Sequence, residues 1–270
     1  MSVSVKTFDT AAEAAQVLSN DRAARFMGGG TWIMRAVNEG NQSFSSVLLA
    51  RDPVLRQVQV QGDRVVIGAG VTMAQILGHG ELAFLHRAAK SVGGPAIRNM
   101  ATVGGNLFAW HPYGDLATAL LALDATVTLA SGNQQQALAD LLRDREREPR
   151  PVVLSVTLTR PQQGAFRFRK VSRVKPKGIS LLTIAANLPQ ASERISGARI
   201  AYGSMADTPV RVPAVEQALE GKTLDEAGIA QAVAAATNGI EPPTDAIASS
   251  WYRKEVAPVH LKRLLLEAAS

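Results

Sequence analysis

The 270-residue sequence contains no cysteine. This absence excludes disulfide bonds, thiol catalysis and any iron–sulfur cluster held by thiolates of this chain. Histidine is also scarce: the chain has four, and no two of them have the spacing typical of metal ligands. We therefore expect no metal site, and a redox role would have to rest on an organic cofactor.

Long hydrophobic runs are missing as well. No apolar segment approaches the roughly 20 residues that a membrane-spanning helix needs, and the first ten residues lack the basic and apolar regions of a secretory signal. Hydrophobic residues make up 46% of the chain and charged residues 19%, an ordinary globular balance. We expect a cytoplasmic protein with two domains, or three compact subdomains.

Aromatic residues are few, at 5% of the sequence. The net charge of +6 and a pI near 9.9 would allow binding to nucleic acid or to an acidic partner. However, the basic residues are scattered, and their densest stretch is confined to 167–177. With so few aromatic side chains for base stacking, we expect no nucleic-acid binding.

Local patterns predict alternating helices and strands up to about residue 160. Thr10 and Glu13 form a capping-box pattern that predicts a helix start, and Thr72 is placed to cap another helix. Gly62-Asp63, between two alternating apolar runs, predicts a hairpin. Further strands are expected at Ala24–Met27, Ser46–Ala50, Ala125–Ala130 and Val152–Thr159.

The pattern changes near residues 160–165. Strands are expected at Phe166–Lys170, Ile179–Leu188 and Ala198–Gly203. After Pro213 the chain is rich in alanine and helical in pattern. The fold class is therefore α+β: α/β subdomains followed by a small sheet with helices at the end of the chain.

Two glycine-rich segments are candidates for binding an anionic ligand. In Met27–Thr31, consecutive glycines would let backbone N–H groups approach a phosphate; a tight turn after a strand explains the same residues. In the second segment, Gly93-Gly94 and Gly104-Gly105 flank small polar residues that could line an extended ligand. Simpler interpretations remain open there too: Gly104-Gly105 bends a strand, and Asp115 caps a helix.

The second segment closely resembles a family signature. Ile97–Asn106 (IRNMATVGGN), Gly114–Leu116 (GDL) and Ala119–Ala125 (ALLALDA) are similar to the FAD-binding subunits of molybdenum hydroxylases, the group of xanthine dehydrogenase, carbon monoxide dehydrogenase and aldehyde oxidoreductases. Gly28–Thr31 and Ile67–Thr72 resemble further motifs of that family. So do later segments of the chain, namely 168–173, 202–203 with 209–211, and 251–254.

The resemblance implies an FAD-binding fold of the PCMH type. Its FAD-binding domain would occupy residues 1–162, in two α/β subdomains at roughly 1–55 and 56–162. A C-terminal domain at 163–270 would hold a small antiparallel sheet and the last helices. The cofactor is FAD, and the residues assigned to it by resemblance are Met27, Gly28, Gly29, Gly30, Thr31, Trp32, Ala101, Thr102, Gly104, Gly105, Asn106, Asp115, Leu154 and Lys170.

The implied function is electron relay. An iron–sulfur small subunit would deliver electrons from a molybdopterin large subunit to FAD on this chain, and the final acceptor would be NAD, quinone or oxygen. The lack of cysteine agrees with clusters on another chain. Two alternatives stay open: a stand-alone FAD oxidoreductase with the same cofactor fold, and a scaffold subunit that has lost its flavin.

This sequence departs from the family pattern at three places. Trp32 stands where Asp or Ser is common, and Trp110-His111-Pro112-Tyr113 replaces smaller residues before the Gly-Asp pair. The second difference leaves local access for substrate or acceptor undetermined. The third is the segment Ser131–Arg150, which is shorter and more charged than is typical. In many relatives this region helps to frame the acceptor side of the flavin, so the electron acceptor also stays undetermined.

Overall fold

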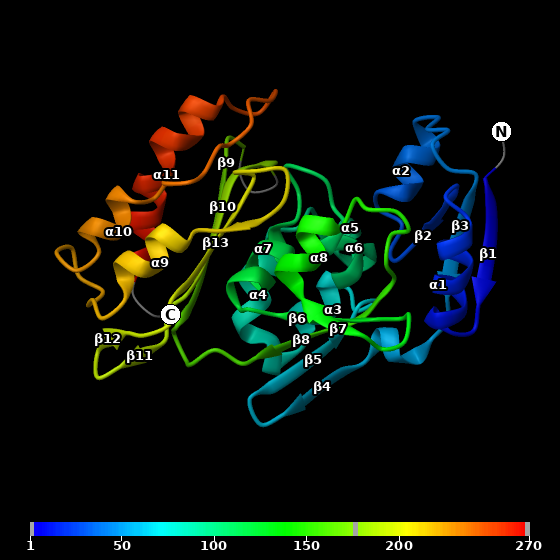
Figure 1. The fold of residues 1–270 in the computed structure, drawn as a ribbon, viewed down its shortest axis with the longest axis horizontal. Helices are drawn as coiled ribbons and strands as arrows, with labels where there is room; N and C mark the ends of the chain where they lie inside the picture. Colours follow the sequence, from blue (N-terminus) through cyan, green and yellow to red (C-terminus); the bar gives the residue numbers. More distant parts are fainter. Residues whose placement is uncertain (1–2, 175–177, 268–270) are drawn as a thin grey trace. The chain divides into compact units, whose positions relative to one another are not determined.

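A computed structural model describes residues 3–174 and 178–267 of the chain (Figure 1). The chain forms two compact units. The first unit comprises Met1–Ala83, Val92–Ala109 and Ala125–Leu158; the second comprises Phe84–Ser91, Trp110–Asp124 and Thr159–Ser270. The predicted domain limits, 1–162 and 163–270, divide the sequence at one point, whereas the two units interleave along it. Those limits therefore stay a prediction.

The first unit begins with a small parallel sheet. Its strands are β1 (Ser4–Phe8), β2 (Ala24–Phe26) and β3 (Ser46–Ala50), in the order β1-β3-β2. Helix α1 (Ala11–Asn20) packs on this sheet through buried Ala11, Ala14 and Leu18. The predicted capping box is present, with the Thr10 hydroxyl accepting from the Glu13 N–H. Strand β1 was not predicted, because most of its side chains are exposed and show no apolar alternation.

A five-stranded sheet forms the rest of this unit. Its order is β4-β5-β8-β6-β7. The predicted hairpin is confirmed as β4 paired antiparallel with β5, and Gly62 at the turn adopts φ +59°, which favours glycine. The strand bounds are β4 (Val58–Gln61), β5 (Arg64–Gly68), β6 (Thr126–Leu129), β7 (Gln135–Ala137) and β8 (Val153–Thr159).

Short helices connect these strands. Thr72 caps α3 as predicted, in a capping box with Gln75. The glycine-rich stretch contains two helices, so the interpretation of Gly104-Gly105 as a bend in a strand is wrong. Both glycines lie inside α6, where the Thr102 hydroxyl accepts from the Gly105 N–H at 3.1 Å. The helices are α2 (Ile33–Asn38), η1 (Pro53–Arg56), α3 (Met73–Gly78), η2 (Gly80–Leu85), α5 (Pro95–Met100), α6 (Val103–Leu107) and α8 (Leu138–Asp144).

The second unit is built on an antiparallel sheet in the order β14-β13-β10-β9. Helix α7 packs on β10 and β13, while α9 and α11 cover the other face (Figure 1). Buried apolar side chains such as Ile184, Tyr202 and Leu261 form the core on the α11 side. The bounds are α4 (His86–Ser91), α7 (Asp115–Ala122), β9 (Phe166–Ser172), β10 (Ser180–Asn187), β11 (Gln190–Ala191), β12 (Arg194–Ile195), β13 (Arg199–Gly203), β14 (Val210–Arg211), α9 (Pro213–Leu219), α10 (Ala230–Ala234) and α11 (Ser250–Leu265).

Side chains of β9 alternate between the two faces of this sheet. Arg167 donates to the carbonyl oxygens at the end of α11, and Arg169 pairs with Glu267 at 2.9 Å. Burial lowers the pKa of Arg167, although the nearby Glu267 partly offsets this. Lys170, the residue after Arg169, points to the opposite face, toward the start of α7. Of the basic stretch noted in the sequence, Lys175 and Lys177 lie outside the described residues.

Across the described ranges, no helix is long and apolar enough to cross a membrane.

Candidate functional site

The first glycine segment forms a loop between β2 and α2. Gly30 adopts φ +74°, a left-handed conformation that favours glycine. Within the described part of the chain, no acceptor bonds the backbone N–H groups of Gly28, Gly29, Gly30 or Thr31. The loop is partly exposed. Four consecutive N–H groups without a partner are the donors that an anionic group needs.

The second glycine segment lies directly against this loop, although about 70 residues separate the two in sequence. A Cβ added at Gly29 would lie 1.5 Å from the carbonyl oxygen of Met100. A Cβ added at Gly28 would lie 2.5 Å from Oγ1 of Thr102. At Gly29 the close approach of two backbones requires glycine, and at Gly28 a side chain would collide with the Thr102 hydroxyl, which accepts from the Gly105 N–H. The structure thus joins the two candidate segments into one site in the first unit.

Hydrogen bonds fix the second segment on β5 and α3. Gly104 N–H donates to the Ala69 carbonyl at 2.7 Å, and Ala69 N–H donates to the Leu154 carbonyl at 2.8 Å. The Ala101 carbonyl accepts from Met73 N–H at 2.9 Å. Leu154 is half-buried on β8, and its carbonyl oxygen connects it to the second segment through Ala69.

The remaining candidates of the first unit flank the loop. Met27 N–H bonds the Leu48 carbonyl at 2.9 Å, and its sulfur would lie 3.1 Å from a Cβ on Gly30. Trp32 immediately precedes α2, and the Arg35 guanidinium lies 5.7 Å from its ring centroid. Asn106 is buried in α6, where its N–H bonds the Thr102 carbonyl at 3.0 Å.

Asp115 and Lys170 belong to the second unit and form an ion pair of 2.8 Å. Asp115 is the first residue of α7, but its side chain makes no cap bond, so the capping interpretation is wrong. Its carboxylate accepts from Lys170 on Oδ2, and from the hydroxyls of Ser180 and Thr183 on Oδ1, both at 2.7 Å. Lys170 also donates to the Ser91 carbonyl at 3.0 Å. The lysine charge is thus balanced inside the unit.

A second cluster of charged side chains lies in the same unit. His111 Nε2 lies 2.7 Å from Oδ2 of Asp245, and Nδ1 lies 3.1 Å from the Ala206 carbonyl oxygen. Arg253 is fully buried and contacts both oxygens of Asp245, at 3.0 and 2.8 Å. Sequence analysis gave no role to Arg253, which lies in the segment 251–254, and did not identify Asp245, because no local pattern connects these residues with His111. The cluster explains His111 as a structural residue.

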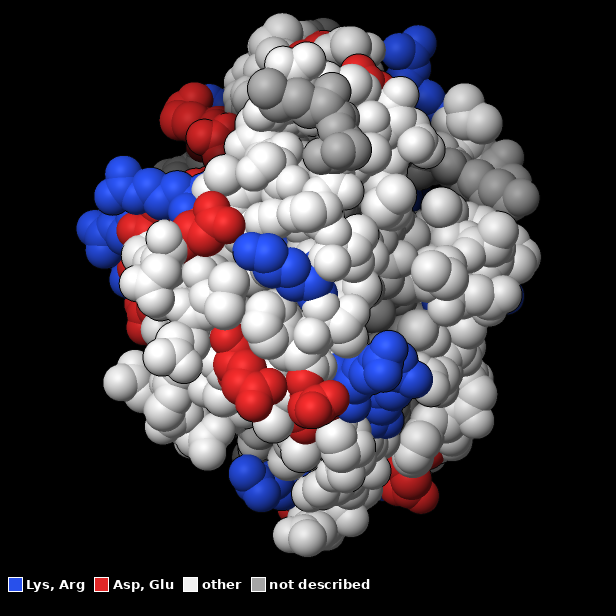
Figure 2. All heavy atoms as spheres, turned by 90° about the vertical axis from the view of Figure 1, so that its right-hand side faces the viewer, with Lys and Arg blue, Asp and Glu red and all other residues white. Residues whose placement is uncertain are grey.

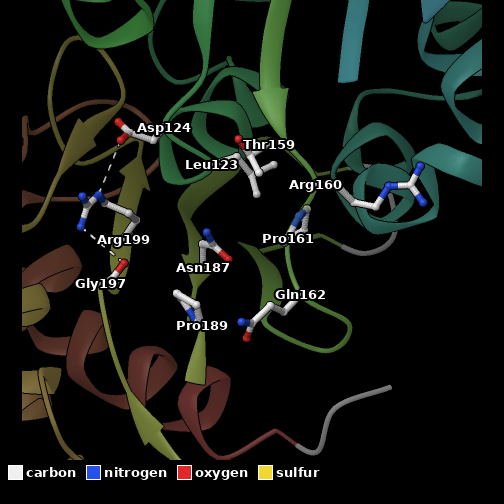
Figure 3. Close-up of a pocket in the computed structure, with 10 residues that line it drawn as sticks. All are labelled: Leu123, Asp124, Thr159, Arg160, Pro161, Gln162, Asn187, Pro189, Gly197 and Arg199. Carbon is white, nitrogen blue, oxygen red and sulfur yellow. Dashed lines mark hydrogen bonds and ion pairs between the residues drawn. The ribbon is translucent and has the colours of Figure 1, made fainter. Parts of the chain in front are cut away.

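A hollow of about 370 Å³ lies at one end of the second unit's sheet (Figure 3). Arg199 extends toward Asp124 and the Gly197 carbonyl, while Arg160 points away from the other labelled side chains (Figure 3). The two guanidinium groups therefore do not converge on one ligand, and none of the residues predicted to bind FAD lines this hollow.

Charged side chains are dispersed over the surface viewed in Figure 2. Lys and Arg are separated there by uncharged surface and by Asp and Glu, and they form no continuous basic area on that face. Within residues 3–174 and 178–267, no three His, Asp or Glu side chains are grouped so that they could hold a metal ion.

The glycine site fits the pyrophosphate of a dinucleotide cofactor. The available donors are the backbone N–H groups of Gly28–Thr31, and no side chain of the three glycines obstructs access to them. Such a site offsets phosphate charge through peptide dipoles, without a lysine. Together with the α+β fold, such a site is typical of proteins that bind a dinucleotide cofactor.

Comparison with known proteins shows the family. The sequence profile of the FAD binding domain in molybdopterin dehydrogenase matches residues 2–161, and that of the CO dehydrogenase flavoprotein C-terminal domain matches residues 167–268. The chain therefore belongs to the FAD-binding subunits of the molybdenum hydroxylase dehydrogenases, and it is an oxidoreductase subunit whose cofactor is FAD. The predicted family, fold class and cofactor are confirmed.

Curated relatives carry matching descriptions. The glyceraldehyde dehydrogenase medium chain of Sulfolobus acidocaldarius is 28% identical over 224 residues, covering 80% of this chain and 79% of the relative. The nicotinate dehydrogenase FAD-subunit of Eubacterium barkeri is 32% identical over 168 residues, 57% of each. The xanthine dehydrogenase FAD-binding subunit of Escherichia coli O157:H7 is 25% identical over 277 residues, covering 97% and 94%.

Solved structures share the fold over the whole chain. The Cu,Mo-CO dehydrogenase superimposes with a TM-score of 0.91 at 23% identity, covering 100% of this chain and 98% of the other. Quinoline 2-oxidoreductase from Pseudomonas putida 86 gives 0.88 at 25% identity, covering 100% and 97%.

Proposed function

We propose that this chain relays electrons within a cytoplasmic molybdenum hydroxylase. An iron–sulfur small subunit supplies the electrons, a molybdopterin large subunit generates them, and the final acceptor is NAD, quinone or oxygen. FAD, when bound, supplies a group that accepts electrons singly and releases them in pairs. The observation that carries the proposal is the set of four unpaired N–H groups at Gly28–Thr31, packed against Met100–Thr102.

The chain's own residues have separate roles in this proposal. The loop N–H groups of Gly28–Thr31 bind the pyrophosphate. Ala101, Thr102, Gly104, Gly105 and Asn106 line the cofactor, and Met27, Trp32 and Leu154 contact it from the flanks. Lys170, neutralised by Asp115, offers an N–H bond to an acceptor atom of the flavin. Clusters must come from another chain, because this one has no cysteine.

The proposal is tested by purifying the chain and recording its visible absorption spectrum before and after denaturation. Flavin absorption, with FAD released on denaturation, supports the cofactor assignment. Reconstitution with separately produced small and large subunits, followed by substrate-driven bleaching of the flavin band, supports the relay.

The two alternatives give different results. A chain whose flavin is reduced by a small substrate without any partner would be a stand-alone oxidoreductase. A colourless chain that takes up no added FAD, alone or with its partners, would be a scaffold, and the proposal would be wrong.

A further inference from the structure

The Asp115–Lys170 pair is held by two hydroxyl groups that no local sequence pattern indicates. Ser180 and Thr183 both donate to Oδ1 of Asp115 at 2.7 Å, and both are buried. Lys170 occupies Oδ2 at 2.8 Å. Each carboxylate oxygen thus has a defined partner. The hydroxyls fix the carboxylate in one orientation.

A β-bulge in β10 brings the two hydroxyls together. Residues three apart on a regular strand point to opposite faces of the sheet. In β10, however, Ser180 pairs with Ser172 and Leu182 pairs with Val171, so Leu181 is one extra residue. Because of this extra residue, the side chain of Ser180 points to the same face of the sheet as that of Thr183.

A hydrogen bond from the opposite face of the sheet stabilises the bulge. The Leu181 carbonyl accepts from Nε of Arg253 at 3.1 Å, and Arg253 is fully buried. Bulges of this kind are typical of places where a side chain must be redirected next to a functional group.

The same face carries Lys170. Thr183 lies directly opposite Lys170 on the neighbouring strand, so their side chains share the face that packs on α7. Among the described residues, the ammonium group has two acceptors, the Asp115 carboxylate and the Ser91 carbonyl. An ammonium group carries three N–H bonds. One N–H therefore remains for a ligand, and its direction is set by the other two.

We propose that Ser180 and Thr183 are positioning residues for the flavin: through Asp115, they aim the remaining N–H of Lys170 at an acceptor atom of FAD. This inference rests on the assignment of Lys170 to the cofactor in the proposed function. Without the hydroxyls, Asp115 can rotate and Lys170 loses its fixed direction, although the charge pair itself survives.

The test compares S180A, T183V and K170M in the full chain, with T183S as the matched control that keeps the hydroxyl. FAD affinity is measured by quenching of flavin fluorescence, and the midpoint potential of bound FAD by titration with a reference dye. K170M should lower the potential, because a cation stabilises the reduced, negatively charged cofactor. S180A and T183V should lower it in the same direction and weaken FAD binding about threefold to tenfold. T183S should match the wild type.

The outcomes distinguish the positioning role of Ser180 and Thr183 from the proposed function. If S180A and T183V keep the wild-type potential while K170M lowers it, positioning is refuted and the proposed function stands. If K170M changes neither quantity, Lys170 has no role at the flavin and the inference falls with that assignment. A wild-type chain that binds no FAD overturns both. Circular dichroism checks folding, and S180A decides alone if T183V does not fold.

Discussion

His111 and Asp245 form a 2.7 Å hydrogen bond that connects the segment before α7 to the loop before α11. On its other side, Asp245 binds the fully buried guanidinium of Arg253 through both carboxylate oxygens. The backbone N–H groups of Ile247 and Ala248 also donate to it. One carboxylate therefore holds together several separate parts of the second unit.

We predict that D245N destabilises the protein by about 3 kcal/mol, because it leaves the Arg253 charge buried without its partner. The free energy of unfolding is measured by urea denaturation. D63N is the matched control, since Asp63 is exposed in the hairpin turn, where Asn is equally suitable. A loss below about 1 kcal/mol for D245N would contradict the role of this carboxylate.

The same residue predicts a pH dependence. Burial by itself raises the pKa of Asp245, but hydrogen bonds from His111, the Ala248 N–H and Arg253 outweigh this and hold the pKa well below its usual range. A carboxyl whose pKa is lower in the folded state stabilises the fold above its unfolded pKa, about 3.9. That contribution is lost as the pH falls further. The stability difference between wild type and D245N should therefore shrink as the pH falls below 4.

We predict that replacing Tyr202 by phenylalanine does not lower the free energy of unfolding. Its hydroxyl is buried in the core of the second unit and has no hydrogen-bond partner in the described structure. Removing an unsatisfied polar group is neutral or stabilising, so Y202F should change the free energy of unfolding by between zero and about +1 kcal/mol. Y202A should lose about 3–5 kcal/mol through the cavity it leaves. A loss above 1 kcal/mol for Y202F would show that the hydroxyl has a partner.

Alkaline unfolding gives an independent check on Tyr202. Burial raises the pKa of its hydroxyl above the usual value near 10. A raised pKa in the folded state means that the contribution to stability is complete below pH 10 and is lost as the pH rises further. The stability of Y202F should therefore decline less than that of the wild type between pH 10 and 12, as measured by denaturation at each pH.

We predict that a side chain at position 29 disrupts the glycine site. An alanine Cβ there would overlap the Met100 carbonyl oxygen, which is backbone and cannot move aside. G29A should therefore lower stability by about 2 kcal/mol or more and abolish high-affinity FAD binding. G78A is the matched control: a Cβ at Gly78, at the end of α3, meets nothing within 4 Å. If G29A binds FAD as tightly as G78A, the two glycine segments are not in the contact described.

Several elements were predictable from local sequence because local chemistry alone specifies them. The capping boxes at Thr10 and Thr72 and the hairpin turn at Gly62 involve residues within three or four positions of one another. Strand β3 was predicted with its observed bounds, since a short buried apolar run has few other interpretations. Edge strand β1 had no such signal.

The sequence by itself determined the family, the fold class and the cofactor, because Ile97–Asn106, Gly114–Leu116 and Ala119–Ala125 together resemble the signature of one family. Only the tertiary structure decided which groups contact one another. Whether Gly29 is needed for a turn or for contact with Met100 depends on a backbone about 70 residues away. Whether Asp115 caps a helix or binds Lys170, Ser180 and Thr183 depends on strands β9 and β10, where one extra residue sets the face of Ser180. Such contacts arise from packing between distant segments, and local patterns do not encode them.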